Sequence, residues 1–439
     1  MNRDHHIIEP PTNTLHTRRA FMRTSILGAA VSWTLPVFLE RTFMTLDAMA
    51  ADSEVQTATG KDGAILVVLQ MAGGNDGLNT VVPYADDAYY KARPIIGIKP
   101  DQVLKINDAI GLHPRLTGLK GLYDDGHLGI VQGVGYPNPD RSHFRSTDIW
   151  QTASDADRYE THGWLGKYFD SCCQGADPTV GIALGSEMPL SFAAAEPKGI
   201  AFARPEQLRW RSGGGDMESL FHELNRPDQA PGDATVSAIS GGTKHGGSPL
   251  EFLQRTALDA QVSSQKISEI AEKFQSKADY PRNPLGQSLS LISRLIAGGL
   301  PTRVYYVSQG GYDTHTQQVG NHDRLLEDLG NSLAAFVKDL KAQGNFDRVV
   351  LMTFSEFGRR VAQNGSNGTD HGAAAPLFVI GGNAKAGLYG KYPSLTELDR
   401  GDLVFNVDFR SVYATVLEQW LKAPSEKVLG RKFPLLPIV

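Results

Sequence analysis

Apolar and β-branched residues recur along the chain in six short runs, and each run is followed by a glycine-rich or polar turn. The runs lie at 64–70, 128–132, 179–183, 303–307, 348–354 and 376–380. Short runs that are apolar throughout, without alternating polar positions, are typical of strands buried on both faces of a parallel sheet. We therefore expect six buried parallel strands.

Between these runs lie longer segments in which apolar residues recur every three or four positions, as on one face of a helix. We expect helices at 249–274, 286–297 and 323–343. Strands that alternate with helices predict an α/β fold, in which helices cover both faces of a mostly parallel central sheet. The stretch 212–248 interrupts the pattern with clusters of Gly, Ser, Asn and Asp, and we interpret it as a surface insertion or a lid.

The N-terminus has a different pattern. Arg18 and Arg19 precede an apolar run at 26–39, and the small-residue sequence Ala-Met-Ala follows at 48–50. This order is that of a twin-arginine export signal, which we assign to residues 1–50. The apolar run is too short to span a bilayer comfortably. We expect the twin-arginine translocase to carry the folded chain out of the cytoplasm.

Composition excludes some functions for the mature chain, 51–439, which is long enough for one large α/β domain. The full sequence has a formal net charge of −5, and its Lys and Arg residues are scattered, so we expect no binding to nucleic acid. No further stretch is apolar enough for a membrane span. The two cysteines, Cys172 and Cys173, are adjacent, which is poor geometry for a disulfide. We expect two buried thiols, with a strained vicinal disulfide as the alternative.

Polar residues that could carry chemistry gather next to the predicted strands. In a doubly wound sheet, ligands bind outside the carboxyl ends of the strands. The candidates are Asp76, Asp313, His315, Glu356, Asp370 and His371. Carboxylates mixed with imidazoles are the ligand set of a divalent metal such as zinc, and two such ions can bind the attacking and leaving oxygens of a phosphoryl or sulfuryl transfer.

Each of these loops also has an ordinary structural explanation. Asp76 lies in the sequence Asn-Asp-Gly, which is a common turn. Asp313 and His315 could belong to a turn at a strand end, and Glu356 could pair with an arginine three or four residues later. The convergence of four such loops at strand ends, more than any single loop, predicts a metal site.

The segment 136–150 brings hydroxyl groups, a histidine and two arginines close together in sequence. Its potential nucleophiles are Ser142, Ser146 and Thr147, and its potential clamps for an anionic ester are Arg141 and Arg145. We favour Ser142, because it lies at the predicted strand-to-helix junction and a helix N-terminus binds anions. The simpler explanation, that Ser142 caps this helix, is compatible with that role.

Together with the leader, these motifs resemble the exported bacterial family known as DUF1501. The resemblance rests on residues 73–79, 141–144, 164–166, 310–315, 355–359 and 369–372 and extends over essentially the whole mature chain. The family is placed in the alkaline phosphatase-like superfamily, whose sulfatases and phosphoglycerate mutases use two metals and a Ser, Thr or formylglycine nucleophile. The resemblance therefore implies that fold and a divalent metal, which we expect to be zinc, manganese or calcium.

The resemblance also implies roles for single residues. Asp76 resembles the superfamily's first metal-binding Asp, Ser142 its nucleophile, Asp313 and His315 a metal pair, and His371 its late His ligand. The sequence departs from the superfamily pattern in two places. Phe357 follows Glu356 where the superfamily usually has an Asp and then a His, and Asp313 and His315 are more closely spaced than usual. These departures leave the number of metal ions open at one or two. The sequence lacks a Cys-x-Pro-x-Arg sulfatase signature, which disfavours a formylglycine-dependent sulfatase.

The sequence thus predicts a periplasmic or secreted metal-dependent hydrolase that acts through Ser142 on an anionic small-molecule or glycan ester of phosphate or sulfate. The alternative is a non-catalytic exported binding protein on a degenerate hydrolase fold, with one structural metal or none. Metal content and ester hydrolysis distinguish the two.

Overall fold

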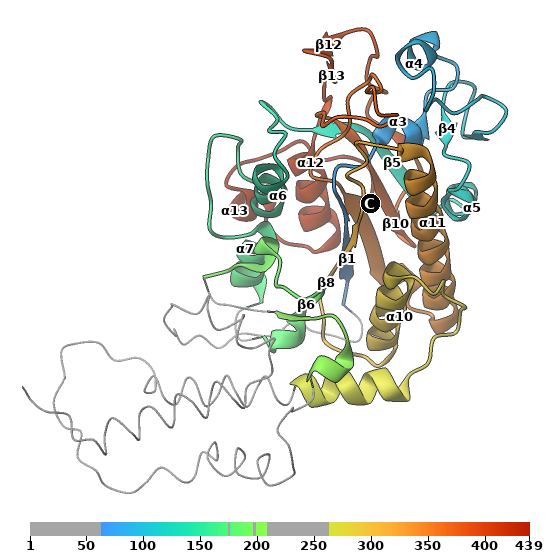
Figure 1. Ribbon diagram of the computed structural model, residues 1–439. Coiled ribbons are helices and arrows are strands. Elements are labelled where there is room, and N and C mark those ends of the chain that lie inside the picture. Colours follow the sequence, from blue (N-terminus) through green and yellow to red (C-terminus); the bar gives the residue numbers. More distant parts are fainter. Residues whose placement is uncertain (1–62, 174–175, 196–198, 209–262) are drawn as a thin grey trace, which may run out of the picture.

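The computed structural model describes residues 63–173, 176–195, 199–208 and 263–439 of the 439-residue chain. Its centre is a nine-stranded sheet with the order β11-β5-β10-β9-β1-β8-β6-β7, and β14 also pairs with β5 (Figure 1). The strands are β1 (Ile65–Ala72), β5 (Leu128–Gly135), β6 (Gly181–Leu184), β7 (Ile200–Phe202), β8 (Val304–Gly310), β9 (Val349–Phe354), β10 (Ala375–Gly381), β11 (Gly387–Tyr389) and β14 (Val407–Asp408). The predicted leader and the predicted insertion at 212–248 lie outside the described residues.

All six apolar runs form strands of this sheet, so the prediction of an α/β fold with a mostly parallel central sheet is confirmed. Among the described strands, the pairs of this sheet are parallel except for β10, which runs antiparallel to both β5 and β9. The prediction that the run at 376–380 is a parallel strand is therefore wrong. The reversal places the residues before β10 at the same edge of the sheet as the residues after the parallel strands.

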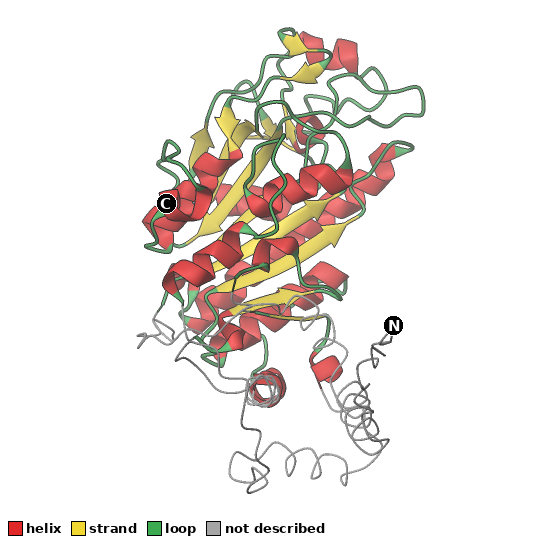
Figure 2. Ribbon diagram, turned by 90° about the vertical axis from the view of Figure 1, so that its left-hand side faces the viewer, coloured by secondary structure: helices red, strands yellow, loops and turns green. Residues whose placement is uncertain are grey.

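Two hydrophobic cores lie on opposite faces of the sheet, because successive side chains of a strand point to opposite faces. In β1, Val67 and Leu69 belong to one core, whereas Leu66 and Val68 belong to the other. The first core is shared with α5 (Thr117–Asp124), α10 (Pro284–Ala297) and α11 (Gln318–Gln343). The second is shared with α6 (His143–Thr152), α7 (Trp164–Cys172), α12 (Phe409–Thr415) and α13 (Ser425–Leu429). Helices therefore cover both faces, as predicted, and Figure 2 shows the sheet beneath one of these layers.

Local sequence explains where the two longest described helices begin or end. The side chain of Asn283 accepts a hydrogen bond from the backbone N–H of Gly286 at 2.6 Å, and α10 begins directly after it with Pro284. α11 ends at Gly344, whose φ of +74° is a left-handed conformation that glycine adopts readily. The helices predicted at 286–297 and 323–343 are confirmed, and the described part of the one predicted at 249–274 is helical at 263–273.

Short elements complete the described structure. They are α3 (Gly77–Thr80), α4 (Asp87–Ala92), a small sheet of β2 (Val81–Val82), β4 (Gly111–Leu112) and β3 (Leu104–Lys105), a hairpin of β12 (Leu398–Asp399) and β13 (Asp402–Leu403), the 3₁₀ turns η1 (Pro178–Val180), η2 (Leu190–Phe192), η3 (Pro205–Leu208) and η4 (Phe346–Arg348), and the π-helical η5 (Val416–Trp420). Cys172 and Cys173 are free thiols whose sulfur atoms lie 3.2 Å apart. Within the described part of the chain, no helix has the length and apolarity that crossing a membrane requires.

Candidate metal centre

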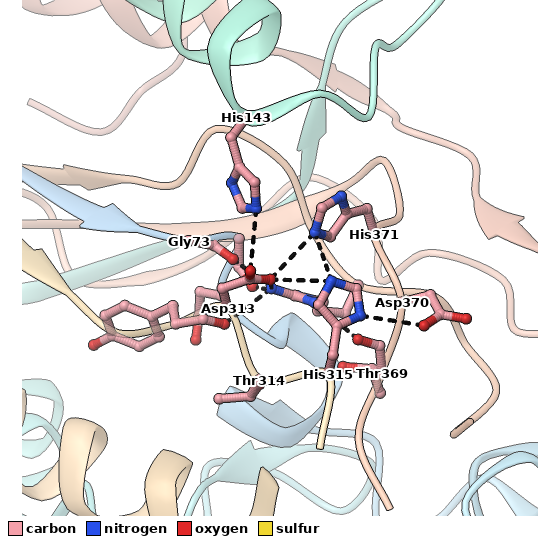
Figure 3. A network of polar contacts seen from close by, with 12 residues as sticks. Gly73, His143, Asp313, Thr314, His315, Thr369, Asp370 and His371 are labelled. Atoms are coloured by element: carbon pink, nitrogen blue, oxygen red, sulfur yellow. Dashed lines mark hydrogen bonds and ion pairs between the residues drawn. The ribbon is translucent and has the colours of Figure 1, made fainter. Parts of the chain in front are cut away.

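Loops at the carboxyl edge of the parallel strands bring three imidazoles around one carboxylate. Asp313 and His315 follow β8, His371 precedes β10, and His143 is the first residue of α6, which follows β5. Figure 3 shows these four side chains converging from separate segments. His143, Asp313 and His371 each contribute one potential ligand atom to a group in which all the atoms lie within 4.8 Å of one another.

The Nε2 atoms of the three histidines lie close to the carboxylate oxygens of Asp313. The Nε2–oxygen distances are 3.5 Å for His143, 3.1 Å for His315 and 3.2 Å for His371. In a tetrahedral zinc site with bonds of about 2.0–2.2 Å, neighbouring ligand atoms lie about 3.3–3.5 Å apart. The spacing of these side chains therefore fits a metal ion of this size.

The other ring nitrogen, Nδ1, of each histidine faces a hydrogen-bond acceptor. The Nδ1–acceptor distances are 3.0 Å from His143 to Glu356 Oε1, 2.7 Å from His371 to the carbonyl oxygen of Arg141, and 3.2 Å from His315 to Asp370 Oδ1. A carbonyl oxygen only accepts, so His371 carries a proton on Nδ1. The carboxylates favour the same tautomer of His143 and His315.

Neutral imidazoles in this tautomer present bare Nε2 lone pairs to one another and to a carboxylate. His315 Nε2 and His371 Nε2 are only 2.9 Å apart, and both lie near Asp313. Several acceptors that face each other need a proton or a cation between them. Metal-binding histidines usually donate their second N–H to a carboxylate or a backbone carbonyl, as these do. The residues therefore fit a divalent metal, and the number of imidazoles favours zinc over calcium.

The carboxylate of Asp313 is ionised in these surroundings. Partial burial opposes ionisation, but Arg359, through its hydrogen bond and its positive charge, is the main cause that lowers the pKa of Asp313 to about 2. Burial lowers the pKa of His371, which favours the neutral imidazole that a metal requires. The side chain of Asp313 is 48% exposed, so the centre is open to ions and small molecules from solvent.

Arg359 connects the loops that form the site. Its buried guanidinium lies 2.7 Å from Asp313 Oδ1. The same guanidinium donates to the carbonyl oxygens of Gly73, Gly74, Tyr312 and Thr369. The loops after β1 and β8 and the segment before β10 are therefore fixed to one side chain.

Glu356 and Phe357, which follow β9, support the histidines in different ways. Glu356 Oε1 accepts hydrogen bonds from the backbone N–H of Gly73 at 2.8 Å and from His143. The second oxygen of Glu356 is buried and has no hydrogen-bond partner among the described residues. The ring of Phe357 packs against His143 and His371, with centroid distances of 4.9 Å and 4.4 Å. Phe357 thus supplies an apolar wall beside these two histidines.

Asp76, which we expected to bind metal, lies outside this group of side chains. It is fully buried, its Oδ2 lies 2.6 Å from the guanidinium of Arg93, and Gln318 also donates to it. Burial opposes its ionisation, but the Arg93 ion pair outweighs burial and lowers the pKa of Asp76. Its Oδ1 accepts from the backbone N–H of Asn79 and caps α3. These contacts give Asp76 a structural role, so we do not include it among the proposed ligands.

Ser142 lies beside the centre, but its expected arginine partners are engaged elsewhere. Ser142 is exposed and directly precedes His143 at the N-terminus of α6. Arg141 pairs with Asp402. The buried guanidinium of Arg145 donates to the carbonyl oxygens of Asp155, Ala156 and Arg158. Arg145 therefore holds the loop after α6 and does not serve as a clamp.

Sequence reasoning missed His143, Arg359 and Gly73. His143 is adjacent to the favoured serine and lies in a motif shared with the family, which was the available signal. Its role depends on contacts with Asp313 and Glu356, which are 170 and 213 positions away in sequence. The structure does bring together the predicted Asp313, His315, Asp370 and His371, with Glu356 as the hydrogen-bond partner of His143.

Comparison with protein families gives a match to one family model. The model described as "Protein of unknown function (DUF1501)" matches residues 64–435. No match was found among curated proteins.

Solved structures similar to this chain include members of the alkaline phosphatase superfamily. One such protein from Vibrio parahaemolyticus has a TM-score of 0.37 and 9% identity, and the match covers 91% of this chain and 79% of that one. The PsFucS1 sulfatase from Pseudoalteromonas sp. has a TM-score of 0.33 and 10% identity, with 94% and 74% covered. The zinc complex of the C-terminal periplasmic domain of EcEptC from Escherichia coli has a TM-score of 0.33 and 12% identity, with 76% and 78% covered. A likeness at this level carries no argument about activity.

Proposed function

This chain belongs to the DUF1501 family of proteins of unknown function, and we propose that it is a metal-dependent hydrolase of phosphate or sulfate esters. The observation that carries the proposal is the set of three histidine Nε2 atoms around Asp313, each on a ring whose Nδ1 faces an acceptor.

His143, Asp313 and His371 would hold the ion, with His315 next to them. When bound, a divalent metal supplies positive charge that stabilises the negative charge developing on the ester oxygens. Glu356 and the carbonyl of Arg141 orient two of the imidazoles. Arg359 places a second positive charge beside Asp313.

The N-terminus of α6 adds donors for an anionic group. The first backbone N–H groups of a helix have no intrahelical acceptor, and they bind anions well. Here these groups belong to His143 and the residues after it, so they lie next to the proposed metal ligand. An ester bound at the ion can therefore place one of its anionic oxygens at this helix end.

We propose Ser142 as the nucleophile. It is exposed, it lies at the same helix end, and its backbone N–H is held by Asp140 Oδ1 at 2.7 Å, which fixes the backbone of the residue. Ser146 is a poorer candidate, because its hydroxyl is buried and bonds to Asp140 and Tyr136.

The leader supports a proposal about location. Export through the twin-arginine translocase places the active protein in the periplasm or outside the cell, where its substrates would be anionic small molecules or glycan esters. The pathway carries folded proteins, and a site assembled from five distant segments forms only after folding.

The test is hydrolysis of 4-nitrophenyl phosphate, bis(4-nitrophenyl) phosphate and 4-nitrophenyl sulfate by the zinc-loaded protein. We expect turnover of at least one ester, and its loss on chelation. Replacing Ser142 with Ala should reduce kcat by about 10³-fold or more while zinc stays bound, because a covalent nucleophile contributes far more than one positioning contact. Thr147→Ala, about one turn further along α6, serves as the matched control and should change kcat less than tenfold.

Two results would contradict parts of this proposal. If Ser142→Ala keeps wild-type turnover, water is the attacking group and the serine assignment is wrong. If the protein binds zinc tightly but hydrolyses none of the esters, the exported binding protein becomes the better interpretation.

A further inference from the structure

A cavity of about 390 Å³ adjoins the candidate metal centre. It lies between the segment that leads into α6 and the β12–β13 hairpin. Its lining includes Asp140, Arg141, Ala373, Asp402, Leu403 and Val404. Nothing in the proposed ester chemistry uses this cavity.

The cavity and the metal centre share two walls. Arg141 lines the cavity, and its carbonyl oxygen accepts the hydrogen bond from His371 Nδ1 at 2.7 Å. Ala373 also lines the cavity, two residues after His371. Asp140, a third lining residue, accepts from the backbone N–H of Ser142. The cavity is therefore a direct neighbour of the metal centre.

The cavity contains a buried acceptor without a hydrogen-bond partner. Asp402 is buried, with its side chain 3% exposed. Its Oδ2 is paired with Arg141, whereas its Oδ1 lies 3.6 Å from Arg360 Nε and has no hydrogen-bond partner among the described residues. Asp402 therefore holds Arg141 and Arg360 in place by ion pairs, and Arg141, whose side chain is 37% exposed, keeps further N–H donors for a ligand in the cavity.

The remaining lining mixes both charges with apolar surface. Arg141 and Arg400 offer donors, and Asp140 and Asp399 offer acceptors. Leu403, Val404 and Phe405 add an apolar wall, of which Val404 is 49% exposed. A polyhydroxylated ring needs this combination, because its hydroxyls both donate and accept while its C–H faces pack on apolar side chains.

We propose that this cavity binds a pyranose ring, so that the substrates are phosphate or sulfate esters of carbohydrates. The substrate assignment rests on the proposed hydrolase function, whereas sugar binding to the cavity does not. In the bound state the ring hydroxyls pair with the charged residues of the lining, and the ester group on the same ring lies on the side of the metal centre.

Direct binding can be measured by saturation-transfer NMR with the methyl pyranosides of glucose, galactose, mannose and N-acetylglucosamine. We expect transfer to at least one of them with the wild-type protein. Val404 lines the cavity and is half-exposed. Val404→Trp should therefore fill the cavity and abolish that transfer. Leu435→Trp, at an exposed apolar position that does not line the cavity, should leave it unchanged. Asp402→Asn removes the charge that holds Arg141 at the cavity and should weaken binding at least tenfold.

Hydrolysis separates failure of the cavity proposal from failure of the proposed function. We expect Val404→Trp to lower kcat/KM for glucose 6-phosphate or glucose 6-sulfate at least tenfold, whereas Leu435→Trp should keep the wild-type value. If sugars bind in a Val404-dependent way but no ester is hydrolysed, the cavity assignment holds and the activity is wrong. If no pyranoside binds, or if Val404→Trp binds them as wild type does, the cavity assignment is overturned, whatever the ester turnover.

Discussion

The tautomer of each histidine decides what the site can bind. His371 must donate from Nδ1 to a carbonyl oxygen, and His143 faces Glu356 in the same way. Only Nε2 is then left for a ligand. A hydrogen bond to a carboxylate also makes Nε2 more basic, which strengthens binding to a metal. Without a metal, the same hydrogen bonds would hold protonated imidazoles. The geometry therefore requires a positive charge at the site, and metal analysis shows whether a metal ion or a proton supplies it.

A prediction at this scale concerns Asp76 and Arg93. Replacing Asp76 with Ala leaves the buried guanidinium of Arg93 without its counter-charge. We expect the free energy of unfolding to fall by about 3–5 kcal/mol, the usual cost of breaking a buried ion pair by removing one partner. Denaturant unfolding of the variant and the wild type measures the difference. Asp108→Ala, at an exposed loop position, is the control and should cost less than about 0.5 kcal/mol.

The same pair predicts a pH dependence. The folded pKa of Asp76 is lowered, so its ionisation stabilises the folded protein above the unfolded pKa of about 3.9. This contribution is lost as the pH falls through the folded pKa. The stability difference between wild type and Asp76→Ala should therefore be constant near neutral pH and should shrink below about pH 4. A difference that stays unchanged down to pH 2 would contradict the assignment.

At the scale of elements, the direction of one strand assembles the site. The sequence segment with Asp370 and His371 precedes its strand, whereas the other candidate loops follow theirs. In a fully parallel sheet this segment would lie at the opposite edge. Because β10 is antiparallel to β5 and β9, it lies at the same edge as the loops after β1, β8 and β9.

Sequence predicted the elements whose pattern is local and missed what depends on distant contacts. The apolar run of β1 and the apolar stripe of α11 signal their structure within a few residues, and both were found. The reversed direction of β10 is set by its neighbours in the sheet and leaves no local mark. The role of His143 could not be predicted for the same reason, because its position in the first turn of α6 does not indicate that Asp313 lies close to it. The Asn-Asp-Gly sequence at Asp76 fits either a metal ligand in a loop or a turn. Only the structure shows the ion pair with Arg93 that distinguishes the two.

A glycine after β1 tests this assembly. Gly73 has a φ of +119°, and a Cβ there would lie 2.5 Å from the backbone nitrogen of Asp313. Gly73→Ala should push the Asp313 loop away and reduce metal affinity at least tenfold, with a loss of about 1–3 kcal/mol in stability. Competition with a chelating dye measures the affinity. Gly121→Ala, on α5 with nothing within 4 Å of its added Cβ, should retain wild-type affinity. Equal affinity in both variants would show that the loop position does not matter for the metal.

At the scale of the whole molecule, the proposed export route requires the chain to fold in the cytoplasm before it acts outside it. The metal centre uses residues from His143 to His371, so the domain has to fold before the site exists. A translocase that carries folded proteins suits such a chain. Replacing Arg18 and Arg19 with Lys keeps the charge but removes the recognised pair. We expect the precursor to accumulate in the cytoplasm, as measured by cell fractionation and immunoblotting. Normal periplasmic amounts of this variant would rule out the twin-arginine route.

The metal content of the purified, zinc-reconstituted and dialysed protein tests the central claim most directly. Mass spectrometry with an inductively coupled plasma should find about one ion per wild-type chain. His143→Ala should lose most of it, because removing one of the few ligands lowers affinity by at least about 100-fold. His162→Ala, an exposed histidine outside the centre, should retain it. No bound metal in the folded wild type, or equal content in wild type and His143→Ala, would contradict the proposed centre.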